Sequence, residues 1–263
     1  MSGVAGAVRE LGYRSLVVVA QLGSLLVFAG AIVRAFAAPP YRLRRWAEEI
    51  FNLGVLSLVI ICVSGLAVGM VLGLQGYNTL VRFGAESSLG AVVGLSLIRE
   101  LGPVLSALLV TGRAGSATAA EIASMVTTEQ IDGLRMMSVD PIEIVVMPKA
   151  SAMLFVMPVL STLFILFGIG GAYVIGVHLM GLDAGIFLSS LTSAVRFSDD
   201  VVGSLVKGLI FGALIGLIAT FRGYHARPTS AGVSSATTST VVITSVAILI
   251  TDYFVTALWG FQI

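Results

Sequence analysis

The sequence has little charge: lysine, arginine, aspartate and glutamate make up only 11% of its 263 residues. A soluble globular domain carries about 25%, so the composition excludes that class. The net charge of +1, without a basic patch interleaved with aromatics, gives no indication of a nucleic-acid partner. One cysteine, Cys62, excludes an internal disulfide. The chain also lacks the Gly-x-x-x-x-Gly-Lys-Ser/Thr loop that cradles nucleotide phosphates, so ATP hydrolysis would need a separate chain.

Apolar residues dominate instead, at 57% of the chain with a mean hydropathy of +1.03. About 20 consecutive apolar residues span a bilayer as a helix. We therefore predict an all-α polytopic membrane protein with about five transmembrane helices and a cytoplasmic helix between the second and third. The predicted spans are residues 50–74, 89–110, 144–177, 201–221 and 240–261. The third is too long for a perpendicular crossing, so we expect either that Pro148 and Pro158 break it or that its first turns lie in the membrane interface.

The N-terminal part, residues 1–46, is predicted to differ from the transmembrane domain, residues 47–263. Arg9 and Arg14 precede an apolar stretch that ends in small residues, a pattern shared with cleaved signal peptides. Arg34 interrupts the stretch, so we favour helices lying on the cytoplasmic membrane surface, with their arginines facing lipid phosphates. A cleaved signal is the alternative interpretation.

Positive charge is distributed unequally between the two sides of the predicted spans, which predicts a cytoplasmic N-terminus and a periplasmic C-terminus. The periplasmic side would hold only Arg82 and Arg196. The cytoplasmic side would hold Arg9, Arg14, Arg34, Arg42, Arg44, Arg45, Arg113, Arg135, Lys149, Arg222 and Arg227.

Besides Lys149 near the start of the third span, four charged residues lie inside the predicted spans. Arg99 and Glu100 precede Pro103 in the second span, and a charge at that depth is a candidate functional group by default. At 1.5 Å of rise per residue, Lys207 and Asp252 lie at a comparable depth in the fourth and fifth spans. Because opposite charges are least costly when clustered, we predict that Lys207 and Asp252 pair with each other or with the Arg99–Glu100 site. Alternatively, Arg99 and Glu100 fill a protein interface, Lys207 reaches the headgroups and Asp252 is protonated.

Glycines recur every four residues in two spans, at positions 65, 69 and 73 and at 208, 212 and 216. Such ladders allow helix backbones to approach closely, and we expect packing within the chain. The segment over residues 113–143 is predicted to be cytoplasmic, with a short amphipathic helix capped by Thr127 and a second helix starting at Asp140-Pro141.

Several segments between residues 52 and 258 resemble the MlaE-type permease family and occur in the same order along the chain. They include Ile98-Arg99-Glu100-Leu101-Gly102-Pro103 and Met136-Met137-Ser138-Val139-Asp140-Pro141, together with residues 69–77, 112–117, 128–130 and 228–232. The resemblance implies a permease subunit of an ABC transporter that moves phospholipids between the Gram-negative inner membrane and a periplasmic carrier, maintaining outer-membrane lipid asymmetry.

The implied assembly is a homodimer with a cytoplasmic ATPase subunit, a STAS-domain accessory protein and a periplasmic hexamer of MCE-domain subunits. The chain itself would hold no cofactor and would not be an enzyme, since ATP would bind to the partner ATPase. Carried over by motif, the lipid-binding residues would be Leu72, Thr79, Leu80, Arg99, Glu100 and Leu101. The residues coupling to the ATPase would be Glu121, Glu129, Asp132, Arg135 and Met136.

Two functions from other classes remain open. In a self-contained ion- or proton-coupled carrier, Glu100, Lys207 and Asp252 would form the relay. A purely structural membrane scaffold would leave these buried charges unexplained. Co-purification with an ATPase separates the ABC permease from both.

Overall fold

The computed structural model describes residues 2–37 and 43–260, and every regular element among them is helical. Arg42, the small-residue end at Ala38 and the last predicted transmembrane residue, Phe261, lie outside the described residues. The α-helices are α1 (Ser2–Ala37), α2 (Leu43–Gly54), α3 (Leu58–Val81), α4 (Leu89–Ser96), α5 (Gly102–Val110), α6 (Ser116–Thr127), α7 (Gln130–Met136), α8 (Met147–Tyr173), α9 (Ala184–Ala194), α10 (Val202–Tyr224) and α11 (Ser230–Gly260).

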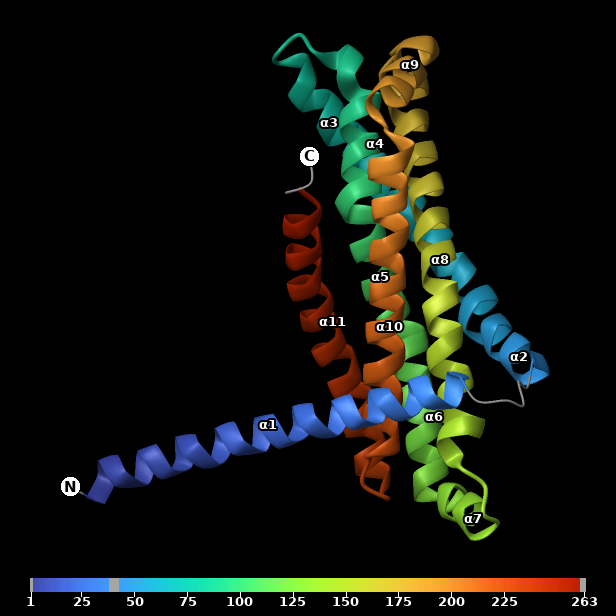
Figure 1. The fold of residues 1–263 in the computed structure, drawn as a ribbon. Helices are drawn as coiled ribbons and strands as arrows, with labels where there is room; N and C mark the ends of the chain where they lie inside the picture. The colour runs from blue at the N-terminus through green and yellow to red at the C-terminus, as the bar shows by residue number, and fades with distance from the viewer. Residues whose placement is uncertain (1, 38–42, 261–263) are drawn as a thin grey trace.

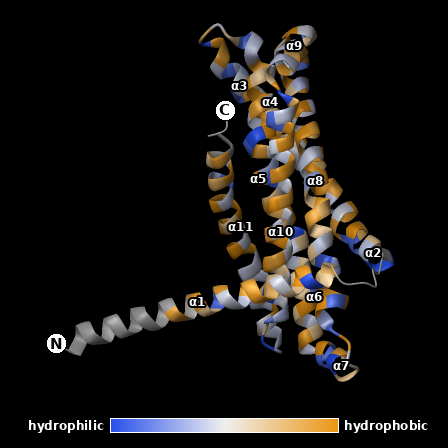
Figure 2. Ribbon diagram, viewed as in Figure 1, coloured by the Kyte–Doolittle hydropathy of each residue, from blue (hydrophilic) through white to orange (hydrophobic). Residues whose placement is uncertain are grey.

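Six helical stretches of the described residues are long and apolar enough to cross a membrane, which confirms the predicted all-α polytopic class. They are Val19–Ala37, Arg44–Val81, Glu86–Thr127, Ile142–Leu179, Phe197–Tyr224 and Ser230–Leu258. The last five run lengthwise through the bundle, whereas α1 lies crosswise to it (Figure 1). Hydrophobic residues occupy much of the length of these helices (Figure 2).

Both glycine ladders pack against α8, so the close helix contacts lie within the chain as predicted. A Cβ atom at Gly69 would overlap the backbone of Gly168, and Gly65 and Gly73 meet α8 one turn to either side. On α10 the second ladder meets α8 in the same way, with Gly212 against the Met153 carbonyl. Helix α8 is therefore the central helix on which α3 and α10 are mounted.

This packing predicts a strong position effect for added methyl groups. Gly69→Ala should destabilise the protein by about 1–3 kcal/mol, the usual size for overpacking, because backbone atoms of α8 cannot move aside as a side chain would. Gly170→Ala is the matched control, since a Cβ there meets nothing within 4 Å. Thermal unfolding of the two detergent-solubilised variants measures the difference. Equal midpoints would contradict the packing account.

The prolines act differently from one another. A π-helical turn, Leu97–Leu101, joins α4 to α5 and ends two residues before Pro103. Pro148 lies in the first turn of α8, where its missing N–H is tolerated. The predicted break at Pro158 is wrong, because α8 continues through it. Neighbouring helices stabilise such interior prolines in membrane proteins.

The ends of the bundle carry the short helices α7 and α9 (Figure 1). Thr127 does not cap α7 as predicted: it is the last residue of α6, and its hydroxyl donates to the Ala123 carbonyl. Helix α7 instead begins after Glu129, which has a left-handed backbone with φ of 59°. The second predicted start is confirmed, since Asp140 Oδ1 accepts from the Ile142 amide at 2.8 Å.

Candidate functional site

Lys207 of α10 is the centre of a cluster of charged and polar groups from three helices. Its ammonium nitrogen lies 2.8 Å from Glu100 Oε2, in the π-helical turn, and 2.9 Å from Asp252 Oδ1 on α11. The pairing expected from depth along the helices is therefore present, and it includes both carboxylates. We name Lys207, Glu100, Asp252 and Thr256 the lysine cluster.

Hydrogen bonds fix the lysine in one orientation. The three N–H groups of an ammonium are matched by three acceptors: the Arg99 carbonyl, Glu100 Oε2 and Thr256 Oγ1, at 2.7 to 2.8 Å. Thr256 in turn donates to Glu100 Oε1 at 3.1 Å. Asp252 Oδ1 receives no hydrogen bond from a described residue, so charge alone holds it to Lys207.

The lysine cluster has a buried and an open side. The Lys207 side chain is 6% exposed, Asp252 is 18% exposed and Glu100 is 41% exposed. A buried cation without a partner would lower the stability of the fold by several kcal/mol. The two carboxylates offset that cost by pairing with the ammonium. Their open side in the single chain is where a ligand or a second protein surface can approach.

Arg99 takes a partner that the sequence pattern did not reveal. Its Nε donates to Asp200 Oδ1 at 2.6 Å, while Asp200 Oδ2 accepts from the Arg196 amide at 2.7 Å. Asp200 is buried, but the Arg99 side chain is 48% exposed. Among the described residues, nothing accepts from its two terminal nitrogens. A guanidinium with a free terminal edge suits a phosphate, which it binds through paired hydrogen bonds.

The apolar members of the predicted lipid site lie apart from these charges in sequence and mostly on another helix. Leu72 and Leu80 of α3 are partly buried and pack against the core, as does Leu101 beside the charges. Thr79 is exposed, and its hydroxyl donates to the Gln75 carbonyl of its own helix. The single chain thus brings together the charged residues but does not itself assign a role to Leu72, Thr79 or Leu80.

A second buried lysine lies at the opposite end of the bundle. Lys149 of α8 donates to Glu49 of α2 at 2.7 Å and to Glu121 of α6 at 2.8 Å. The Lys149 side chain is 6% exposed, against 20% for Glu49 and 58% for Glu121. One cation therefore joins three helices, and Glu121 is the only predicted coupling residue among the three.

Arg113 strengthens the same junction. Its Nη1 donates to the carbonyls of Asn52 and Leu53 and to the Ser57 hydroxyl, the last at 2.7 Å. Carbonyls in the last turn of a helix have no partner within it, so Arg113 caps the C-terminal end of α2. Helix α2 is thereby fixed to the long helix that leads to α7.

The other predicted coupling residues gather on and beside α7, at the tip of the bundle. Arg135 donates to Asp132 at 3.0 Å and to the Tyr224 hydroxyl of α10 at 2.8 Å. The hydrogen bond to Tyr224 raises the pKa of Arg135, which stays charged. Met136 is 84% exposed and Met137 is 65% exposed, while Glu129 forms the turn before the helix. Exposed apolar side chains flanked by charges are the kind of surface that a protein partner can cover.

Sequence reasoning missed Asp200, Thr256 and Glu49. Thr256 lies four residues after Asp252 and therefore shares its helical face, which was an available signal. Asp200 lies directly before the predicted fourth span, but only the rotation of that helix decides whether it faces Arg99. Glu49 had no comparable signal, since its partner Lys149 lies 100 residues later in the chain and was counted only as a cytoplasmic charge.

The chain is similar in sequence to known permeases over most of its length. The family model described as Permease MlaE matches residues 46–258. The chain is 51% identical over 211 residues to the intermembrane phospholipid transport system permease protein MlaE of Haemophilus influenzae, covering 80% of this chain and 81% of that protein. It is 39% identical to a probable ABC transporter permease protein of Rickettsia felis, covering 95% and 96%. It is 31% identical to the chloroplastic protein TRIGALACTOSYLDIACYLGLYCEROL 1 of Arabidopsis thaliana, covering 88% and 65%. The chain belongs to the MlaE permease family.

Proposed function

We propose that this chain is the membrane permease subunit of an ABC transporter that moves phospholipids between the bacterial inner membrane and a periplasmic MCE-domain carrier, maintaining outer-membrane lipid asymmetry. The relative from Haemophilus influenzae is named for intermembrane phospholipid transport, and that from Rickettsia felis as an ABC permease. The lysine cluster with its open side beside Arg99 is the structural observation that supports a ligand with an acidic headgroup.

In this function the charged groups meet the headgroup and the apolar residues meet the acyl chains. The free terminal edge of Arg99 binds the lipid phosphate, while Asp200 holds the guanidinium in position. Glu100 and the lysine cluster offer partners to the rest of the headgroup. Leu72, Leu80 and Leu101 line the apolar part of the cavity, with Thr79 at its edge.

The cavity is completed by a second copy of the chain. Most of the membrane-spanning part of α11 is unburied in the single chain, as are Glu100 and Thr256 in part. A second protomer against this face would enclose the lipid between two lysine clusters. The N-terminus is cytoplasmic and the C-terminus periplasmic, so the open side lies toward the outer leaflet and the MCE-domain hexamer above it.

A cytoplasmic ATPase, joined by a STAS-domain accessory protein, drives the cycle through α7. Motion of α7 passes to α6. One π-helical turn joins α6 to α5, and α5 directly follows the turn that carries Arg99 and Glu100. The Lys149 contacts add α2 and α8 to the same moving unit. ATP binds to the ATPase and not to this chain.

Charge reversal on α7 should separate ATP hydrolysis from transport. Asp132→Lys removes the Arg135 ion pair and places a cation against the ATPase surface, so we expect at least a tenfold loss of lipid transfer. The membrane dimer should persist, because Asp132 is exposed and far from the packed core. The measurements are transfer and ATPase rates of the reconstituted complex. Glu48→Lys is the matched control outside α7, because it also reverses an exposed carboxylate that pairs with an arginine of its own helix. Crosslinks from Asp132 that reached only lipid would contradict the docking role.

Purification of the tagged chain from native membranes tests the proposed function. We expect an ATPase with a phosphate-binding loop to co-purify in equal amount with the permease. The competing function is an ion-coupled carrier, favoured by the Lys207 ammonium between two carboxylates. Transport by the pure chain, driven by an ion gradient without any ATPase, would support that carrier and overturn the proposal.

A further inference from the structure

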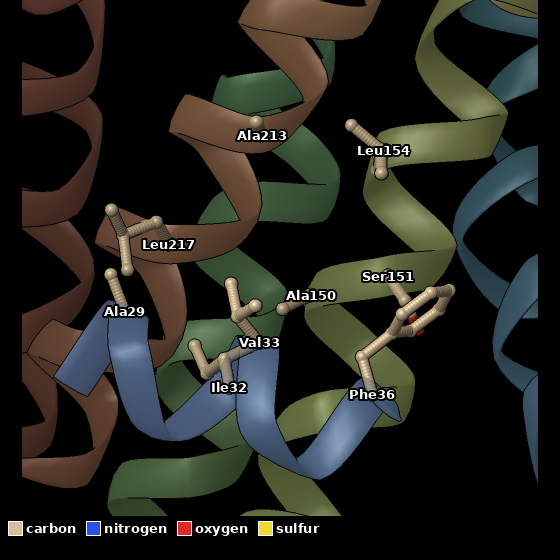
Figure 3. A pocket seen from close by; sticks show the side chains of 9 residues that line it. All are labelled: Ala29, Ile32, Val33, Phe36, Ala150, Ser151, Leu154, Ala213 and Leu217. Atoms are coloured by element: carbon tan, nitrogen blue, oxygen red, sulfur yellow. The ribbon is translucent and has the colours of Figure 1, made fainter. Parts of the chain in front are cut away.

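An apolar pocket of about 260 Å³ lies where α1 crosses α8 and α10 (Figure 3). Val33 and Phe36 of α1, Ala150 and Leu154 of α8, and Ala213 and Leu217 of α10 form most of its wall. The side chains of α1 point from below toward the two bundle helices, leaving the space between them unfilled (Figure 3). Neither the lipid site nor the coupling surface uses this pocket.

Its position along the helices places it near one membrane surface. Ala150 lies three residues after the first residue of α8, and Leu217 lies seven residues before the last residue of α10. At 1.5 Å per residue these are depths of about 5 and 10 Å. Beside the pocket, Trp46 Nε1 donates to Ser151 Oγ at 3.0 Å, and tryptophan favours the boundary between headgroups and acyl chains. With the proposed orientation, this boundary belongs to the cytoplasmic leaflet.

The pocket is also separate from the lysine cluster. Ala213 and Leu217 follow Lys207 on α10 by six and ten residues, or roughly 9 and 15 Å along the axis. A ligand here would therefore belong to the opposite leaflet from a lipid held at Arg99.

The chemistry of the wall and rim selects one kind of occupant. Water needs two to four polar partners, and Ser151 is the polar residue of the lining. Val33 is 67% exposed and Phe36 is 46% exposed, so the pocket opens at its α1 side. Its volume equals roughly nine water-sized groups of about 30 Å³, enough for a segment of one acyl chain. Exposed arginines on α1 and α2, Arg34, Arg44 and Arg45, supply positive charge for a phosphate at this level.

We propose that this pocket binds one acyl chain of a phospholipid from the cytoplasmic leaflet, with its phosphate at the α1–α2 arginines. The bound chain fills the space under α1 and fastens that helix to α8 and α10. This lipid is a resident of the site rather than transported cargo. The proposal rests on the membrane orientation in the proposed function but not on ATP-driven transport.

The test is photolabelling of the full chain in nanodiscs that contain phosphatidylglycerol with a diazirine in mid-chain. We expect labelling of Leu154 and Leu217 to exceed that of Val59, a 74% exposed residue of α3, by at least fivefold. Dilution with unlabelled lipid before illumination should reduce the signal at Val59 first, because a seated chain exchanges slowly. Equal labelling with equal loss at all three positions would mean bulk lipid only and would overturn the proposal.

A filling variant checks the same site independently. Ala213→Phe places a ring in the pocket and should lower labelling at Leu154 at least fivefold, whereas Val59→Phe should leave it unchanged. If Ala213→Phe fails to fold, the wild-type labelling pattern still decides. Selective labelling without a co-purifying ATPase would support the lipid pocket and reject the proposed transporter. Unselective labelling of a chain that does co-purify with an ATPase would reject the lipid pocket alone.

Discussion

Replacing Lys207 with methionine should lower the free energy of unfolding by about 3–5 kcal/mol and stop lipid transfer, because Glu100 and Asp252 lose their shared cation. Asp252→Asn should cost much less, since Lys207 keeps its three hydrogen bonds and its ion pair with Glu100. Unfolding in detergent, followed by lipid transfer in reconstituted vesicles, measures both effects. Arg82→Met, at an exposed arginine after α3, controls for loss of a positive charge.

The double variant Lys207→Met/Asp252→Asn gives the sharper measurement. Removing both members of an ion pair leaves fewer uncompensated charges, so its cost should be smaller than the sum of the two single costs. Interacting residues differ from additivity by roughly 0.5–3 kcal/mol. Strict additivity within error would mean that Lys207 and Asp252 do not interact in the folded protein.

Lys149→Met should have the second largest effect, about 3–5 kcal/mol at most, since one buried cation holds α2, α6 and α8 together. The two carboxylates should contribute unequally. Glu49 is 20% exposed, so Glu49→Gln should be clearly destabilising. Glu121 is 58% exposed and screened by solvent, so Glu121→Gln should cost under about 1 kcal/mol.

These variants also test whether the junction carries motion. Lys149→Met protein that still folds should hydrolyse ATP with little lipid transfer, because α6 is no longer fixed to α2. Glu48→Gln is the matched control, since its ion-pair partner among the described residues is the exposed Arg44 of the same helix. Normal transfer per ATP in Lys149→Met would limit the junction to a purely structural role.

The depth of the membrane charges could be predicted from the sequence because helical rise converts residue number directly into depth. That is why Lys207, Asp252 and Glu100 were expected to meet. The rotation of each helix about its own axis is not encoded as simply, and rotation decides that Arg99 faces Asp200. The resemblance also implied a cavity lined by Leu72, Thr79 and Leu80, and in the proposed homodimer a second protomer would supply its other wall.

Errors at helix ends have a different physical origin. Proline rules come from soluble helices, and Pro158 is tolerated because α8 is enclosed by α3 and α10. The capping pattern at Thr127 was misleading, since a threonine hydroxyl also bonds back to the carbonyl four residues earlier and can end a helix as readily as start one. Lys149 was counted only as a cytoplasmic charge, and its burial was not foreseen because its two carboxylate partners are distant in sequence.

The most direct test of the central proposal is ATP-driven transfer of a fluorescent phospholipid between vesicles and a soluble MCE-domain acceptor, measured in both directions. The vesicles contain the permease with its co-purified ATPase. We expect transfer that requires ATP and is lost in Leu72→Arg, which places a charge in the apolar part of the cavity, but is kept in the exposed control Val59→Arg. Transfer that continues without ATP, or that Leu72→Arg leaves unchanged, would contradict the proposed lipid path.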